Sequence, residues 1–212
     1  MKDLLPTLYY VHDPMCSWCW GFRPVWDQLQ DVLTGKVNVQ YVLGGLAPDT
    51  DQLMPDDMRV NIRSNWQRIQ QEIPGTEFNY DFWTDCQPRR STYPACRAII
   101  ACRMQQPLLE TRMLLAIQQA YYLNAKNPSD NNILVKIADG IGLDIDVFSE
   151  DLTGDKCNKI FEKELLLTKK LAVNSFPGLV LLNKSVLVNI HIDYTSQSYI
   201  LKQIYKNIGS SF

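Results

Sequence analysis

The sequence predicts an α/β protein in which a sheet built from both ends of the chain is interrupted by a long helical insertion. Three observations carry this prediction. A short apolar strand near the N-terminus leads into a Cys-x-x-Cys pair and an amphipathic helix. Strand-like patterns then disappear between about residues 47 and 171, and two strands and a closing helix follow. With 212 residues, the chain is long enough to bury a substantial core.

The first element is a short strand that ends beside two cysteines. Residues 8–11 (Leu-Tyr-Tyr-Val) are apolar and too few for a helix, so they favour a buried strand. From Phe22 to Leu33, apolar residues recur at helical spacing. Cys16 and Cys19 lie between these elements, within residues 13–20 (Asp-Pro-Met-Cys-Ser-Trp-Cys-Trp), and therefore at a strand-to-helix turn.

This turn predicts different roles for the two thiols. At the start of a helix, unpaired N–H groups and the positive end of the helix dipole favour the thiolate of Cys16. The thiolate is the form that attacks disulfides. Cys19 follows one helical turn later on the same side, so it can resolve a mixed disulfide. We predict Cys16 as the nucleophile and Cys19 as the resolving thiol.

The remaining elements follow from periodicity and from glycine and proline. A second strand is expected at residues 37–43, before Gly44 and Gly45. Helices are expected at about residues 55–73, 91–105, 109–124, 131–140, 146–151 and 155–171. The aromatic segment 78–83 is interpreted as a loop lining a cleft. Strands at 178–182 and 186–192 and a helix around 200–208 complete the chain. The predicted domains are residues 1–46 with 172–212, and an inserted helical subdomain of residues 47–171.

This order of elements resembles the thioredoxin superfamily, and the helical insertion is similar to its DsbA-like branch. Three motifs resemble the FrnE-like subgroup of predicted protein-disulfide oxidoreductases and isomerases, namely residues 13–22, residues 93–98 (Tyr-Pro-Ala-Cys-Arg-Ala) and residues 120–122 (Ala-Tyr-Tyr). Pro24 also fits, because first helices in the superfamily commonly carry a proline eight residues after the first cysteine. The resemblance implies a thioredoxin fold with a large inserted helical subdomain and thiol–disulfide exchange as the activity.

The resemblance also implies a second site element in residues 175–178 (Ser-Phe-Pro-Gly). In the superfamily, the proline at this position is cis and faces the cysteines, and the preceding residue offers its backbone to an extended substrate. Pro177 and Phe176 are therefore the predicted substrate-binding residues of this element. Trp18 lies between the two cysteines and is expected to be partly exposed. It is the third predicted substrate-binding residue.

One feature of the superfamily is missing. Thioredoxin and DsbA have a buried carboxylate six residues before the nucleophile, where this chain has Tyr10. We name His12 as a candidate proton shuttle, because an unperturbed pKa of about 6.5 suits that task. The alternative is a structural histidine satisfied at the end of a strand. Because a strand alternates faces, either His12 or Asp13 could point toward the thiols.

The other cysteines do not form a second functional pair. If Cys96 and Cys102 share a helix, their Cα atoms are about 9 Å apart, which exceeds disulfide reach. We predict both, and Cys157, as core residues, and Cys86 as an accessory thiol in a loop. A zinc site is not expected, because the chain has a single Cys-x-x-Cys and two histidines. Arg97 is a candidate for holding an anion, although a solvated arginine on a helix face is preferred.

Composition and charge exclude several partner classes. Apolar residues make up 46% of the chain and the net charge is −2, so nothing drives binding to nucleic acid or to an anionic membrane. No apolar run approaches the roughly 18 residues needed to span a bilayer. The N-terminus lacks a signal-peptide pattern, so we expect a cytoplasmic protein, or a periplasmic one if a leader was removed. We expect no cofactor beyond the cysteine pair, which a reductant of the glutathione or thioredoxin type could renew.

The sequence thus predicts a thiol–disulfide oxidoreductase, whether reductase, isomerase or oxidase, acting on disulfide- or thiol-containing proteins or small molecules. Ser17 and Trp18 lack the histidine that DsbA carries between its cysteines, so we expect a potential below about −120 mV. Two alternatives stay open. One is a glutathione-dependent transferase or isomerase similar to the kappa-class transferases and hydroxychromene-carboxylate isomerases, against which Cys19 argues. The other is a non-catalytic binder of unfolded or hydrophobic ligands.

Overall fold

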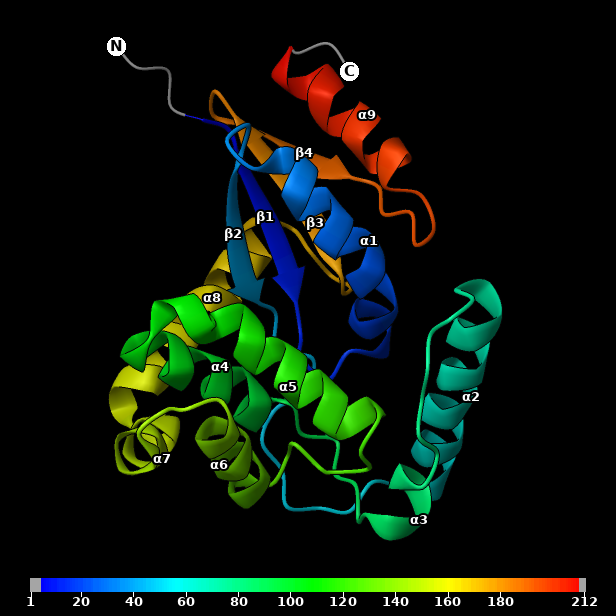
Figure 1. The fold of residues 1–212 in the computed structure, drawn as a ribbon, viewed down its shortest axis with the longest axis vertical. Coiled ribbons are helices and arrows are strands. Elements are labelled where there is room, and N and C mark those ends of the chain that lie inside the picture. Colours follow the sequence, from blue (N-terminus) through cyan, green and yellow to red (C-terminus); the bar gives the residue numbers. More distant parts are fainter. Residues whose placement is uncertain (1–4, 210–212) are drawn as a thin grey trace.

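A four-stranded mixed sheet forms one end of the molecule (Figure 1). The computed structural model describes residues 5–209. The strands are β1 (Thr7–His12), β2 (Asn38–Leu43), β3 (Gly178–Asn183) and β4 (Val186–Ile190), in the spatial order β2-β1-β3-β4. β1 and β2 are parallel, whereas β3 is antiparallel to both of its neighbours. The two ends of the chain therefore share one sheet, as predicted.

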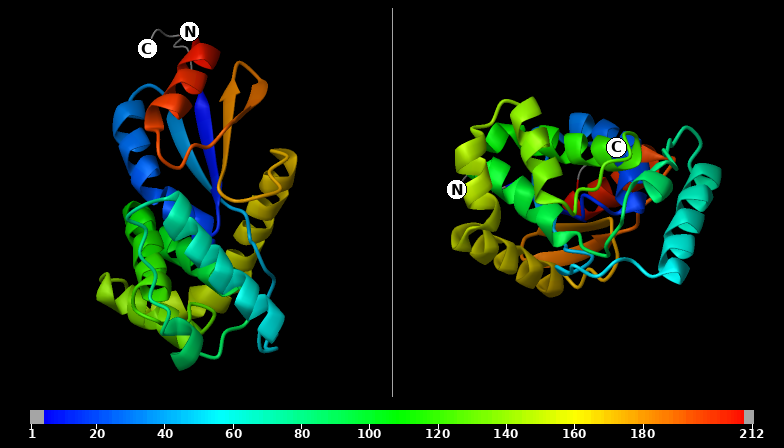
Figure 2. Two further views of the ribbon diagram at one scale, coloured as in Figure 1. Left: turned by 90° about the vertical axis from the view of Figure 1, so that its right-hand side faces the viewer. Right: turned by 90° about the horizontal axis from the view of Figure 1, so that it is seen from below.

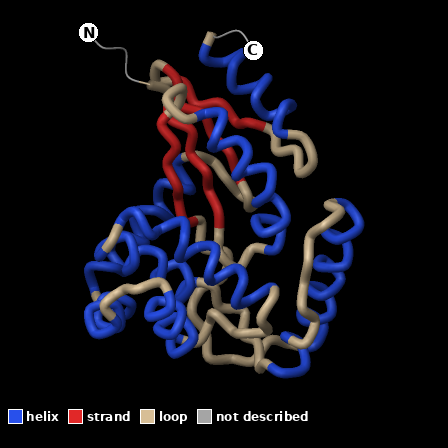
Figure 3. Tube along the Cα trace, in the orientation of Figure 1, coloured by secondary structure: helices blue, strands red, loops and turns tan. Residues whose placement is uncertain are grey.

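The helices of the insertion gather at the other end of the molecule (Figure 3). Helix α1 (Ser17–Leu33) joins β1 to β2, and α9 (Gln197–Ile208) closes the chain. Between them lie α2 (Asp56–Glu72), α3 (Phe82–Asp85), α4 (Tyr93–Gln105), the 3-10 turn η1 (Pro107–Leu109), α5 (Glu110–Tyr122), α6 (Asn131–Gly140), α7 (Ile145–Thr153) and α8 (Asp155–Lys170). No helix within residues 5–209 has the length and apolar character needed to cross a membrane.

Different helices cover the two faces of the sheet (Figure 2). On one face, Tyr10 of β1 stacks on Trp26 of α1, with ring centroids 4.2 Å apart, in a core that α9 also joins through Ile204. On the other face, Val11 packs with Leu171 at the end of α8. Helix α8 packs against both the sheet and the helices of the insertion, so the two predicted domains are in contact at the predicted boundary near residue 172. The predicted domain division stays a prediction.

The aromatic segment at residues 78–83 belongs to the core of the helical part. Its Phe78, Phe82 and Trp83 are at most 9% exposed and surround the fully buried Trp66 of α2. Residues 78–81 are a loop, as predicted, whereas Phe82 and Trp83 belong to α3, and the three rings pack in the core instead of lining a cleft. The physical reason is that packing these rings on Trp66 removes a large apolar area from water.

Candidate active site

The Cys-x-x-Cys pair occupies the first turn of α1. Cys16 has an extended backbone (φ −82°, ψ 115°), and its carbonyl accepts the first helical hydrogen bond from the N–H of Trp20 at 3.1 Å. No side chain caps this end of the helix, and the first turn carries no acidic residue. The N–H groups that a helix start leaves without helical partners therefore belong to the residues that directly follow Cys16.

The two thiols differ in their access to solvent. Cys16 is 6% exposed and lines a pocket, whereas Cys19 is completely buried. Burial raises the pKa of Cys19 well above its ordinary value, and a hydrogen bond with Cys16 and the charge of that residue add to the rise. The two sulfurs are not bonded to each other. Cys16 therefore borders the pocket and Cys19 does not, which is the asymmetry that the predicted roles require.

The segment before β3 faces the cysteines. The Cys16 thiol donates a hydrogen bond to the carbonyl oxygen of Phe176 at 3.4 Å, across 160 positions of sequence. The peptide bond between Phe176 and Pro177 is cis. Gly44 permits this approach, because a Cβ atom there would lie 2.1 Å from Cε1 of the Phe176 ring. The structure thus brings Phe176 to Cys16, while the role of Phe176 and Pro177 in substrate binding stays a prediction.

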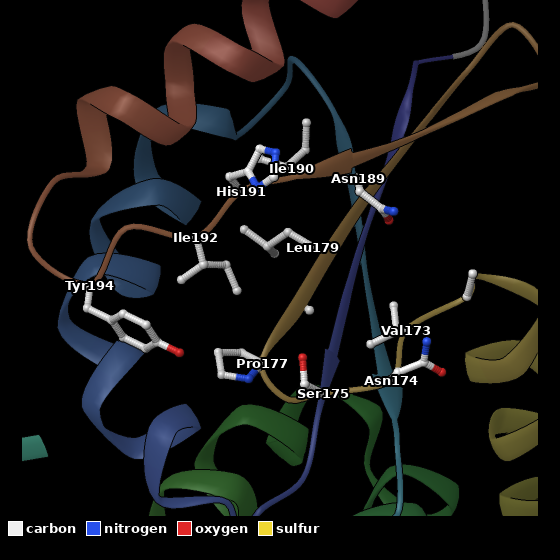
Figure 4. A pocket seen from close by; sticks show the side chains of 12 residues that line it. Val173, Asn174, Ser175, Pro177, Leu179, Asn189, Ile190, His191, Ile192 and Tyr194 are labelled. Atoms are coloured by element: carbon white, nitrogen blue, oxygen red, sulfur yellow. The ribbon is translucent and has the colours of Figure 1, made fainter. Parts of the chain in front are cut away.

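Two pockets meet at this segment. The first, which we call the thiol pocket, has a volume of about 300 Å³ and is lined by Cys16, the half-buried Trp18 and Phe176, among others. The second, the proline pocket, measures about 380 Å³ and lies beyond Pro177. Figure 4 shows that its lining side chains come from the segment before β3, from β3 and β4, and from the segment after β4. Residues 174–175 line both pockets.

A buried carboxylate does lie next to the cysteines, although not at the superfamily's position. Asp13 is 0% exposed and accepts hydrogen bonds from the Met15 N–H (2.8 Å), the Leu46 N–H (2.7 Å) and the Thr92 hydroxyl (2.6 Å). The Cys96 thiol also contacts it at 3.6 Å. Burial raises the pKa of Asp13, and these hydrogen bonds oppose the rise. The carboxylate therefore ties the cysteine turn to two distant segments.

His12 takes no part in these hydrogen bonds. Its ring stacks on Tyr10 with centroids 5.0 Å apart, is 1% exposed, and finds no hydrogen-bond partner for either nitrogen in the described part of the chain. Burial, followed by the charges of Arg103 and Arg23, lowers the pKa of His12 to about 3. This value lies well below the pKa of about 6.5 on which the shuttle prediction was based, and the role of His12 stays a prediction. Neither ring nitrogen has a partner within residues 5–209, and the choice between a proton shuttle and a structural histidine stays open.

The low pKa of His12 predicts a loss of stability in acid. Below about pH 6.5 the unfolded chain protonates this ring, whereas the folded protein does so only near pH 3, so stability rises with pH between these values. The expected slope is about 1.4 kcal/mol of unfolding free energy per pH unit. Urea unfolding at about pH 6 and about pH 5 measures it, and a His12→Leu variant should lack this contribution. Equal slopes in the two proteins would contradict the prediction.

The remaining cysteines lie outside the thiol pocket. Cys96, Cys102 and Cys157 are 0% exposed, which confirms their prediction as core residues. Cys86 is half-buried, and its thiol donates to the carbonyl of Ala125 at 3.2 Å. Within residues 5–209, no group of three or more His, Cys, Asp or Glu side chains is placed to hold a metal ion.

Arg97, the predicted candidate for holding an anion, does not line the thiol pocket. Arg97 pairs with both carboxylate oxygens of Asp49, at 2.7 and 2.8 Å, so it is neither a free anion site nor a solvated side chain. Arg90 lines the thiol pocket instead. It was missed because it lies in a loop, where no periodicity indicates the direction of a side chain.

One family model and several curated proteins match this chain. The thioredoxin family model matches residues 9–202. The chain is similar to the ClpXP adapter protein SpxH of Halalkalibacterium halodurans, with 26% identity over 183 residues that make up 84% of this chain. That match covers 59% of the relative, so the chain spans about three fifths of the length of the curated relatives it matches.

Solved structures of disulfide oxidoreductases share the fold. The cytosolic disulfide reductase DsbM from Pseudomonas aeruginosa superposes with a TM-score of 0.76, at 22% identity over 95% of this chain and 98% of DsbM. The oxidoreductase DsbA from Xylella fastidiosa gives 0.63, at 13% identity over 97% of this chain and 85% of that protein. These likenesses confirm the predicted α/β fold of the DsbA-like kind with its helical insertion.

Proposed function

Because this chain belongs to the thioredoxin family, we propose that it is a thiol–disulfide oxidoreductase that works through Cys16 and Cys19. The observation that carries the proposal is the asymmetry of the pair. Cys16 lines the thiol pocket at the start of α1, whereas Cys19 is buried directly behind it. The fold shared with DsbM and DsbA supports the same activity.

The reduced enzyme acts in two exchange steps. The Cys16 thiolate attacks a substrate disulfide, so that a bond forms between Cys16 and one substrate sulfur while the other leaves and takes up a proton. Cys19 then loses its proton and attacks the Cys16 sulfur, which forms the internal disulfide and releases the second thiol. The raised pKa of Cys19 keeps it protonated before the mixed disulfide forms. A reductant of the glutathione or thioredoxin type returns the pair to the dithiol.

The proposed substrates are disulfide- or thiol-containing proteins or small molecules. Trp18 and the Phe176–Pro177 segment would contact them beside Cys16, and the proline pocket offers room for a chain that continues past Pro177. In a cytoplasm poised between about −220 and −320 mV, an oxidising couple rests reduced and acts as a reductase or isomerase. We propose this compartment and direction for the protein.

A redox titration of the whole protein in defined glutathione buffers tests the proposal. Alkylation and mass spectrometry report the state of Cys16 and Cys19 at each buffer potential. A single two-electron transition below about −120 mV is the expected result. If no internal disulfide forms and Cys16 instead accumulates bound glutathione, the proposal fails and a transferase activity is favoured.

A second candidate is a protein-binding role that needs no redox chemistry. The similarity to SpxH proteins, which are ClpXP adapters, favours it. A Cys16→Ala/Cys19→Ala double variant separates the two roles. Suppression of the aggregation of an unfolded test protein should survive in this variant if binding is the function, whereas disulfide exchange should be lost.

A further inference from the structure

Arg90 is an unpaired cation in the wall of the thiol pocket. The side chain is half-buried and lies in the loop before α4. Across residues 5–209, it makes no ion pair and no hydrogen bond with another residue, whereas the neighbouring Arg89 binds Asp130 and the Ser129 carbonyl. Tyr121 lines the same pocket. Burial raises the pKa of Tyr121, and the positive charge of Arg90 opposes this rise. The guanidinium is therefore available to a ligand in the pocket.

The charge of the thiol pocket favours an anion. No aspartate or glutamate is among the residues that line it, and Arg90 is the one lysine or arginine among them. Asn65, Asn174 and Ser175 add neutral polar groups. A half-buried cation without a partner is stabilised by an incoming anion. A carboxylate suits it best, because guanidinium can bind both carboxylate oxygens at once.

The size of the pocket limits the ligand. A volume of about 300 Å³ is at the lower end for small-molecule sites. The aromatic residues Trp18, Trp66 and Tyr121 line it together with Arg90, so it combines apolar surface with one cation. It suits a thiol of a few residues that carries its carboxylate a short way from its sulfur, with the sulfur at Cys16 and the carboxylate at Arg90.

We propose that Arg90 makes the thiol pocket selective for carboxylate-bearing thiols and disulfides of low molecular weight, of which glutathione is the test case. This inference rests on the proposed function. Cys16 attacks glutathione disulfide, so that a Cys16–glutathione bond forms and one glutathione thiolate leaves and is protonated. Cys19 then displaces the second glutathione. Two electrons pass from the cysteine pair to the disulfide, and the pair becomes the Cys16–Cys19 disulfide.

The test compares a charged and an uncharged disulfide. The reduced whole protein is mixed with glutathione disulfide or with hydroxyethyl disulfide, and the loss of free thiols is followed by rapid quenching, alkylation and mass spectrometry. Arg90→Gln should slow the reaction with glutathione disulfide about tenfold, the loss that one charge-assisted hydrogen bond predicts. Its rate with hydroxyethyl disulfide should stay within about twofold of the wild-type rate. For the wild-type protein, the ratio of the rate with glutathione disulfide to the rate with hydroxyethyl disulfide should also fall as salt is added.

Two further variants make the test specific. Arg90→Lys keeps the charge and should retain part of the preference. Arg112→Gln removes the same charge from an exposed position on α5 outside the pocket, so both rates should stay at wild-type values. Circular dichroism of each variant confirms that it is folded.

The outcomes separate this inference from the proposed function. If Arg90→Gln slows both disulfides equally, or neither, Arg90 does not select carboxylates and the inference is overturned while the redox function stands. If the wild-type protein reacts with neither disulfide, the proposed function fails and the inference fails with it. If the loss appears only with a long acidic peptide disulfide, the anion belongs to a protein substrate, which also overturns the inference.

Discussion

The Cys19→Ser variant is expected to lose multiple-turnover disulfide reduction by at least about a hundredfold, while Cys16 still forms a mixed disulfide. Cys19 is completely buried beside Cys16, so it is the thiol placed to attack the mixed disulfide within the same molecule. Without a resolving thiol, the mixed disulfide waits for an external thiol to release it. Steady-state reduction of a disulfide substrate measures the loss, and intact mass detects the trapped adduct on Cys16.

Cys86→Ser provides the matched control for this variant. Cys86 is half-buried and lies outside the thiol pocket, so turnover should be unchanged. Full turnover by Cys19→Ser would contradict a two-cysteine mechanism. If that variant also transferred glutathione to an electrophilic substrate, the glutathione-dependent transferase or isomerase would replace the oxidoreductase as the function.

The elements that the sequence predicts well are those set by local patterns. The bounds of α2, α4 and α8 lie within about two residues of the predicted ones, because helical periodicity and flanking prolines and glycines are local signals. The placement of the cysteines at the start of α1 follows from the same signals. The pairing of Cys16 with Phe176 spans 160 positions, so only the family resemblance could indicate it.

The features of the site that the sequence could not predict depend on contacts between distant residues. Asp13 meets Thr92 across 79 positions, and no periodicity reports such a contact. The pKa of His12 is lowered first by burial and then by the charges of Arg103 and Arg23, and all of these causes come from the fold and not from its neighbours in sequence. A carboxylate directly after a buried strand and next to the cysteines was a signal for Asp13, but its partners could not be named from the sequence.

Replacing Asp13 with alanine is expected to lower the free energy of unfolding by about 3 to 5 kcal/mol. The substitution leaves the buried Met15 N–H, the Leu46 N–H and the Thr92 hydroxyl without their acceptor. Each unsatisfied buried donor costs about 1 to 3 kcal/mol. Urea unfolding at neutral pH measures the change. Because Met15 precedes Cys16, the rate at which Cys16 is alkylated should change as well.

Two comparisons identify the hydrogen bonds as the cause of this loss. Asp139→Ala removes an exposed carboxylate on α6 and should change stability by less than about 0.5 kcal/mol. Thr92→Val removes one donor with little change in shape, and it remains informative if Asp13→Ala does not fold. A double-mutant cycle of Asp13→Asn with Thr92→Val should give a coupling energy of about 1 to 3 kcal/mol. Additive effects would mean that the carboxylate does not act through Thr92, and the link between the cysteine turn and α4 would have to be carried by packing alone.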